Sequence, residues 1–345
     1  MKLLVFEFAT AMGVEDPSIT AEGHAMLYGL LDDLKDYKTH HLIPNWSETI
    51  KTSHSRDIPV HGDLKEWLLN NIKDYDACLP VAPEENNLLH DLTMIIEDQG
   101  VEVVGSSSNA VKITTNKFDM YNVLKGKVPV IKTKQIFFNE KEHIYQKSLF
   151  DEGVTKVVKP ADGVSCSGVH VVKSVADLKK AQNHIKTITK LPYYLIQDYV
   201  PGVNASVSIL SNGQTAVPLS LNFQNVRLNG GEINYTGGKV PFNHKISDIA
   251  MEVAKNAVEC VDGLKGYVGV DMILDGEKVH LVEINSRLTT PYVALRRLIN
   301  FNLGDAIIRA VHGELPTEVK LNGRANFCKE GKTLRVSVYN ENRRL

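Results

Sequence analysis

The chain has 345 residues, a net charge of −2, 43% apolar residues and 23% charged residues, a balance typical of a globular protein with more than one core. Basic and acidic residues are intermixed, which gives no reason to expect nucleic acid or a membrane surface as a partner. No segment reaches the roughly 18 apolar residues of a membrane helix. The four cysteines are scattered without metal-type spacing, so we expect a cytoplasmic chain with reduced thiols.

Residues 1–105 alternate strand and helix patterns. The predicted strands are 2–9, 40–43, 76–81 and 101–105, and the predicted helices are 20–34 (capped by Thr20), 64–72 and one beginning at Pro83. This order predicts a parallel sheet. Glu7 interrupts the opening apolar run, which favours a buried strand over a secretion signal. No Gly-x-Gly-x-x-Gly follows that strand, but a predicted loop, 10–19, lies at its carboxyl end, where such sheets bind ligands.

The remainder mixes helices and antiparallel strands. Helices are predicted at 109–124, 140–149, 175–186, 246–261, 291–300 and 304–312, and strands at 155–159, 169–173, 193–199, 206–210 and 216–221. Residues 224–243 are rich in glycine and asparagine and predict a mobile loop. The tail from Thr317 is expected to be irregular, with one strand-like run at 333–338.

Two further strands, 269–274 and 280–287, are joined by the turn Asp275-Gly276-Glu277 into a predicted hairpin. Glu283 and Asn285 are two residues apart and share one face, to which Asp271 can also point. Such an oxygen-only set suits hard divalent cations and not zinc or copper. The alternative is an ordinary amphipathic hairpin with a polar outer face.

A small-residue loop follows the strand that ends at Lys159. Its residues Gly163, Ser165, Ser167 and Gly168 let backbone N–H groups approach an anion. The loop is not a Walker A motif, and a plain hairpin turn is the alternative. Lys117 begins a predicted helix, a position that favours anions, although a solvated lysine is the commoner outcome.

The segment Gln197-Asp198-Tyr199-Val200-Pro201-Gly202 is a strand that stops at Pro-Gly. Its backbone groups are then left free to bond an adenine edge, with help from Gln197. A strand end without a ligand is the alternative.

In chain order, five elements resemble the ATP-grasp superfamily over residues 106–315: Lys117, Lys159 with its loop, segment 197–202, Asp271 and segment 283–287. The resemblance implies an α/β and α+β architecture, an ATP-grasp fold preceded by an N-terminal parallel α/β (pre-ATP-grasp) domain. The implied domains are 1–105 (pre-ATP-grasp), 106–195 (small lobe), 196–315 (large lobe with the metal site) and 316–345 (tail).

The resemblance also implies roles in binding ATP. Lys117 and Lys159 would contact the α- and β-phosphates, and Ser165, Ser167 and Gly168 would cover them. Gln197, with the backbone of Asp198 and Val200, would hold adenine. Asn204 stands where many relatives carry a ribose-binding glutamate.

The resemblance assigns a metal site and a catalytic group as well. Asp271, Glu283 and Asn285 would hold two Mg²⁺ or Mn²⁺ ions, and Arg287 would face the transferred phosphoryl group or the substrate carboxylate. Lys159 and Arg287 would offset charge during transfer. Cys166 is interpreted as loop filling.

The first-domain segments 6–16, 22–23 and 82–86 resemble the acid–amine ligases of methanofuran biosynthesis. That resemblance implies an acyl phosphate on the side-chain carboxylate of L-glutamate, attacked by the amine of tyramine to give γ-glutamyltyramine, ADP and phosphate. Candidate proton acceptors are Glu7 and Glu15. Arg227 and Tyr235 are candidates for substrate contact, with a solvated loop as the alternative.

Other functions remain open at this point. They are a ligase for another amino acid and amine, a carboxylase, a nucleotide-binding protein without turnover, and a sugar- or amino-acid-binding module. A carboxylase would need a carrier that the sequence does not show. Small molecules are the expected partners, and the oligomeric state, a homodimer included, stays open.

Overall fold

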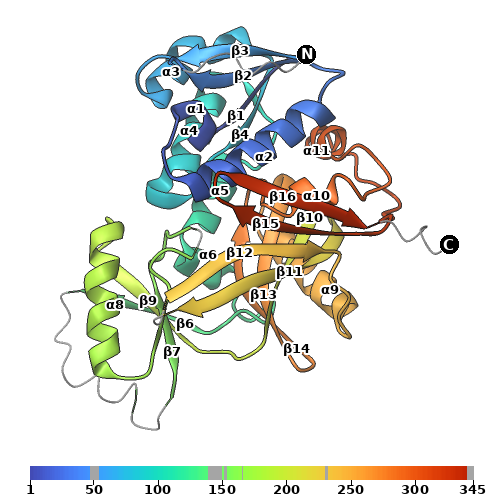
Figure 1. The fold of residues 1–345 in the computed structure, drawn as a ribbon. Helices are drawn as coiled ribbons and strands as arrows, with labels where there is room; N and C mark the ends of the chain where they lie inside the picture. Colours follow the sequence, from blue (N-terminus) through green and yellow to red (C-terminus); the bar gives the residue numbers. More distant parts are fainter. Residues whose placement is uncertain (47–53, 139–149, 151–153, 165, 230–231, 340–345) are drawn as a thin grey trace.

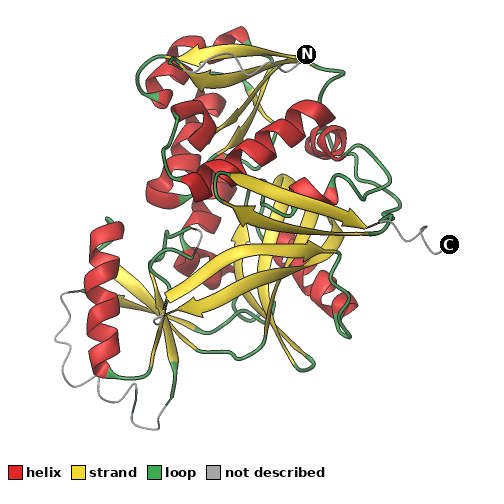
Figure 2. Cartoon of the chain, in the orientation of Figure 1, coloured by secondary structure: helices red, strands yellow, loops and turns green. Residues whose placement is uncertain are grey.

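The computed structural model of the chain describes residues 1–46, 54–138, 150, 154–164, 166–229 and 232–339. These residues form a five-stranded sheet near the N-terminus and an eleven-stranded sheet that runs through the rest of the molecule (Figures 1 and 2). Among the described residues, no helix is long and apolar enough to cross a membrane.

The N-terminal sheet is parallel throughout, as predicted. Its strand order is β3-β2-β1-β4-β5, from β1 (Lys2–Glu7), β2 (Lys38–Pro44), β3 (Ser55–Val60), β4 (Ala77–Val81) and β5 (Glu102–Val103). The helices of this region are α2 (Pro17–Asp33), α3 (Leu64–Asn71) with η1 (Ile72–Asp74), and α4 (Leu88–Asp98) after η2 (Glu85–Asn87). Strand β1 is almost wholly buried, which explains its continuous apolar sequence.

Several local predictions for this region are wrong. The chain after β1 is not a loop but α1 (Phe8–Met12), which Glu7 caps. Helix α2 begins at Pro17 and is capped by Asp16, not by Thr20. Pro83 does not begin α4, because Asn86 and Asn87 adopt positive φ angles first. Strand β3 had no counterpart among the predictions.

The next part of the chain forms a smaller lobe. It contains α5 (Ser108–Thr115), α6 (Lys117–Leu124), β6 (Thr133–Phe137), β7 (Lys156–Lys159), β8 (His170–Val172), α8 (Val175–Ile188) and β9 (Tyr193–Asp198). The single helix predicted at 109–124 is split at Asn116, whose extended backbone ends α5 and whose side chain caps α6. The helix predicted at 140–149 lies outside the described residues.

A larger, mostly antiparallel part of the sheet follows. Its strands are β10 (Val203–Asn212), β11 (Ala216–Asn229), β12 (Glu232–Val240), β13 (Lys265–Asp275) and β14 (Lys278–Asn285), accompanied by α9 (Ser247–Glu259), α10 (Tyr292–Leu295) and α11 (Leu303–Val311). One face of these strands packs on α9 through a buried apolar cluster.

The predicted mobile loop at 224–243 is wrong, because β11 and β12 occupy it as paired strands. Gly237 and Gly238 serve close backbone packing instead of mobility, whereas Gly230 and Gly231 lie outside the described residues. A Cβ on Gly237 would lie 2.2 Å from the carbonyl oxygen of Phe327, and one on Gly238 would lie 2.3 Å from that of Phe223. Glycine in a strand often marks such a close approach.

The tail is also more ordered than predicted. It forms a hairpin of β15 (Arg324–Glu330) and β16 (Thr333–Tyr339), and β15 pairs with β12. Figure 1 shows this hairpin, in red, between α2 and β12. Phe327 joins Leu27 and Leu30 of α2 in one apolar core, so the tail connects the N-terminal region to the large sheet.

Candidate active site

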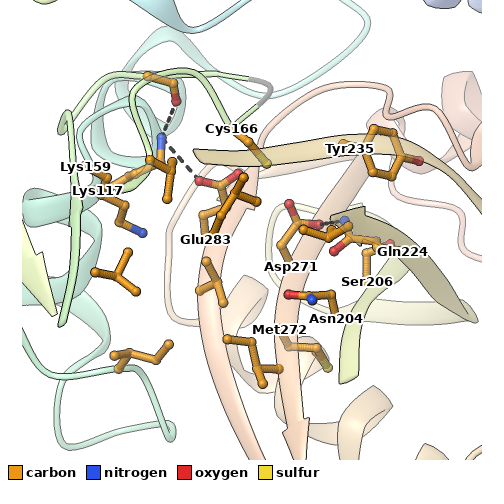
Figure 3. Close-up of a pocket in the computed structure, with 18 of the residues that line it drawn as sticks. Lys117, Lys159, Cys166, Asn204, Ser206, Gln224, Tyr235, Asp271, Met272 and Glu283 are labelled. Atoms are coloured by element: carbon orange, nitrogen blue, oxygen red, sulfur yellow. Dashed lines mark hydrogen bonds and ion pairs between the residues drawn. The ribbon is translucent and has the colours of Figure 1, made fainter. Parts of the chain in front are cut away.

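A cavity of about 340 Å³ lies between the smaller lobe and strands β10–β14, a volume that suits a small-molecule ligand. It is lined by twelve of the predicted site residues: Lys117, Lys159, Ser167, Gln197, Asp198, Val200, Asn204, Tyr235, Asp271, Glu283, Asn285 and Arg287. Figure 3 shows how the labelled members of this set converge from different elements.

Two lysines form the cationic wall of the cavity. The Lys117 ammonium donates a 2.6 Å hydrogen bond to the carbonyl oxygen of Gly163 and lies 3.2 Å from Glu283 Oε2. Lys159 is only 3% exposed, and burial lowers its pKa to about 8, although nearby Glu283 opposes that shift. A buried ammonium close to a second one stabilises an anion placed between them.

The small-residue loop borders these lysines. Ser167 lines the cavity, whereas Gly168 is buried, has a φ of +68°, and shapes the loop: a Cβ there would lie 2.4 Å from Ile188 Cδ1. Cys166, expected only to fill the loop, also lines the cavity, and burial raises the pKa of its thiol to about 12. Ser165 lies outside the described residues.

The predicted hairpin brings its polar side chains together. Asp271 of β13 stands opposite Glu283 of β14, next to a bulge. Asp271 accepts a 2.9 Å hydrogen bond from Gln224 Nε2 and a 3.4 Å bond from Asn285 Nδ2. Burial raises the pKa of Asp271 to about 8, and the charge of Glu283 makes the next largest contribution. Burial would also raise the pKa of Glu283, but Lys117 and Lys159 outweigh it and lower that pKa.

This donor set fits a hard divalent cation. Two partly buried carboxylates in contact repel one another, and a cation between them would remove that repulsion. The part of the chain that the structure describes holds no group of three or more His, Cys, Asp or Glu side chains suited to a metal. A cation here would therefore complete its shell with Asn285, phosphate oxygens and water, which is how Mg²⁺ usually binds.

We expect binding of MgADP to release protons. Below pH 8 the raised pKa keeps Asp271 mostly protonated, and a cation must displace that proton. Affinity should therefore rise with pH toward about pH 8 as Asp271 ionises, and fall above it as Lys159, whose pKa is also about 8, loses its charge. Calorimetry in buffers of different ionisation enthalpy measures the released protons. If the Asp271→Asn variant released as many protons as the unmodified chain, Asp271 would not be their source.

The strand end of β9 forms another part of the cavity wall. Gln197 Nε2 donates a 2.7 Å hydrogen bond to Thr133 Oγ1, and exposed Asp198 pairs with Lys156 at 2.5 Å. Val200 and Asn204 follow, where the chain passes from β9 to β10. The side chain of Gln197 is thus oriented by β6, and backbone beyond Asp198 borders the cavity.

Arg287 lies at the boundary with the N-terminal domain. Its Nε and Nη2 atoms are 2.9 Å and 2.8 Å from Glu84 Oε2. Burial would lower the pKa of Arg287, but Glu84 outweighs it and raises that pKa. Glu84 orients this guanidinium toward the cavity, a role that the sequence alone did not reveal.

Three predicted substrate residues do not line the cavity. The carboxylate of Glu7 caps α1, accepting from the backbone N–H groups of Ala9 and Thr10 at 3.1 and 2.8 Å. Glu15 and Arg227 are exposed. The structure instead brings in Glu22 and Thr290, which line the cavity without having been predicted. The one sign of Glu22 in the sequence was that segment 22–23 belongs to the resemblance of the first domain.

Comparison with known proteins shows the family of the chain. A family model described as ATP-grasp domain matches residues 114–291, and one described as pre ATP-grasp 3 domain matches residues 45–111. The chain is 33% identical over 323 residues to a tyramine–L-glutamate ligase of Methanocaldococcus jannaschii, covering 90% of each.

Solved structures show the same fold. A structure described as an ATP-grasp superfamily protein from Archaeoglobus fulgidus has a TM-score of 0.72 and 26% identity, covering 99% of this chain and all of that one. The biotin carboxylase domain dimer of Hydrogenobacter thermophilus, solved with MgADP and bicarbonate, has a TM-score of 0.75 at 13% identity, covering 95% of this chain and 74% of that one. At that identity only the fold is comparable.

Proposed function

Because this chain belongs to the ATP-grasp family and is an ATP-dependent carboxylate–amine ligase, we propose that it joins the side-chain carboxylate of L-glutamate to the amine of tyramine. The observation that carries the proposal is the meeting of Lys117, Lys159 and the Asp271–Glu283 pair in one cavity. The identity to ligases named for these two substrates supports the choice of acid and amine.

The proposed reaction has two steps. A carboxylate oxygen of glutamate attacks the terminal phosphorus of ATP, and ADP leaves. The amine nitrogen then attacks the acyl carbon of the resulting acyl phosphate, and phosphate leaves with the C–O bonding electrons, giving γ-glutamyltyramine. Magnesium or manganese ions, when bound, would offset the phosphate charge.

The residues of the cavity have different roles in the proposed reaction. Lys117 and Lys159 hold the phosphates, with Ser167 and the loop around Gly168 over them. Asp271, Glu283 and Asn285 carry the cations. Catalysis is then mainly positioning and electrostatic stabilisation, since no covalent enzyme intermediate is required.

Other residues position the two ends of the substrates. Adenine lies against Gln197 and the backbone of Asp198 and Val200, with its ribose near Asn204. Arg287, oriented by Glu84, faces the glutamate carboxylate or the transferred phosphoryl group. A homodimer stays a prediction.

An ADP-release screen with Mg²⁺, single amino acids and single amines tests the proposal. We expect release with L-glutamate plus tyramine, and little with either alone, because an acyl phosphate without an amine stops after one turnover. Equal release with any amine would reject tyramine as the specific substrate. ATP binding without release in any combination would favour a nucleotide-binding protein without turnover.

A further inference from the structure

One corner of the cavity has no role in holding ATP under the proposed function. It consists of Glu22 from α2, Tyr235 from β12, and Thr290 from the segment that precedes α10, and is called here the Glu22 corner. Figure 3 shows Tyr235 beyond Asp271, on the side away from Lys117 and Lys159. A substrate bound there would lie past the metal-binding carboxylates.

The carboxylate of Glu22 is held firmly. The Thr290 hydroxyl donates to Glu22 Oε2, and the Lys329 ammonium pairs with Glu22 Oε1. The Glu22 side chain is only 17% exposed. Lys329 does not line the cavity and reaches Glu22 from β15, where it also donates a 3.0 Å hydrogen bond to Ser18 Oγ and lies 5.5 Å from the Tyr235 ring centroid.

The pairing with Lys329 has a chemical implication. Lys329 carries a primary alkylammonium group, so Glu22 already binds a group of the kind that a primary amine substrate presents at neutral pH. A carboxylate has about four lone-pair positions, and Thr290 and Lys329 occupy two. Glu22 can therefore accept a further N–H from the cavity side.

Other groups near the corner are poorly suited to accept a proton. Burial, with a smaller contribution from Glu22, raises the pKa of Tyr235 well above its usual value, so its hydroxyl stays protonated. Arg287 is permanently charged. Glu283 pairs with Lys117, Asp271 accepts from Gln224 and Asn285 at the proposed cation site, and Asp198 pairs with Lys156 at the adenine end.

We propose that Glu22 binds the ammonium group of the amine substrate and takes its proton before the nitrogen attacks the acyl phosphate. This inference rests on the proposed ligase function. The N–H bond breaks to leave a neutral amine and a protonated Glu22. The nitrogen lone pair then forms the N–C bond, the C–O bond to phosphate breaks, and the second nitrogen proton leaves with phosphate.

The Glu22→Gln variant tests this role, with hydroxylamine as a second nucleophile. Hydroxylamine is uncharged at neutral pH, so it needs neither ammonium binding nor deprotonation before it attacks; its nitrogen proton leaves with phosphate afterwards. We expect kcat/KM for tyramine to fall by about 10²–10⁴-fold, while hydroxamate formation from L-glutamate and ATP stays within about threefold. Because alkylammonium groups titrate near pH 10.4, the tyramine defect should shrink as pH rises.

Lys329→Gln is the matched control, since it removes the same ion pair but keeps Glu22. It should retain tyramine-dependent turnover. Equal loss of tyramine turnover in both variants, or loss of hydroxamate formation in Glu22→Gln, would mean that the ion pair only joins α2 to β15 and would overturn the inference. Unchanged tyramine kinetics in Glu22→Gln would overturn it too. Failure of the unmodified chain to form hydroxamate would instead reject the proposed function.

Discussion

Glu283→Gln is expected to abolish amide formation. Glu283 lies at the centre of the cavity, 3.2 Å from the Lys117 ammonium and opposite Asp271 on the neighbouring strand. The change removes a charge that both lysines and a bound cation would share, so turnover should fall by at least about 10²–10³-fold, the scale seen when one preorganised electrostatic group is lost. ADP release at saturating ATP, Mg²⁺ and both substrates measures the effect.

The fold of this variant should be retained. Loss of the Glu283 charge removes one of the effects that keep Asp271 protonated, which offsets the loss of the pairing with Lys117. We therefore expect the free energy of unfolding to change by no more than about 1 kcal/mol. Glu277→Gln is the matched control, because it makes the same change in the turn of the same hairpin, where the side chain is 84% exposed. Normal turnover in Glu283→Gln would remove the metal site from the proposed mechanism.

Asp33→Ala should be the most destabilising of the substitutions considered. Asp33 ends α2, accepts a 2.5 Å hydrogen bond from the Tyr292 hydroxyl, and pairs with Arg296 Nη2 at 2.6 Å. Asp33 and Arg296 have side chains only 9% and 13% exposed. Removing one partner of a buried pair typically costs about 3–5 kcal/mol. Arg296 keeps a pairing with the exposed Asp32, so we expect a loss near the lower end of that range.

Urea unfolding followed by circular dichroism measures this cost. Glu318→Gln is the control, because the Glu318–Lys320 pair is equally short, at 2.7 Å, but its side chains are 61% and 64% exposed. Exposed pairs contribute at most about 1 kcal/mol. If the two variants lost similar stability, the contact between the N-terminal region and α10 would not depend on Asp33.

The fold was predictable where the periodicity of the sequence was strong. Strand β1 and helices α2, α8 and α9 appear near their predicted positions, since β1 is a continuous apolar run buried on both faces and each helix buries one apolar face. The errors arise where composition misleads. Gly237 and Gly238 predicted a loop, but they belong to β12. Glycine is required there because the neighbouring backbone leaves no room for a Cβ. Strand β15 was missed because its short buried set, Ala325 and Phe327, lies in a polar run.

Part of the cavity was predictable from the periodicity of short segments. Alternation on a strand places Glu283 and Asn285 on one face, and hairpin pairing brings Asp271 opposite them. Such local geometry can be inferred without tertiary contacts. The position of Glu22 depends on how α2 packs against the large sheet and β15, and no local pattern specifies that packing.

The sequence by itself determined the parallel N-terminal sheet, the polar hairpin and the order of the phosphate-binding elements, because these depend on periodicity and turn chemistry within short segments. The tertiary structure alone decided which distant groups meet: Glu84 with Arg287, and Glu22 with Thr290 and Lys329. These pairs join residues more than 200 positions apart, and the apolar packing of α2, α10 and β15 brings them into contact. Side-chain contacts of that range follow from the whole core and not from any one segment.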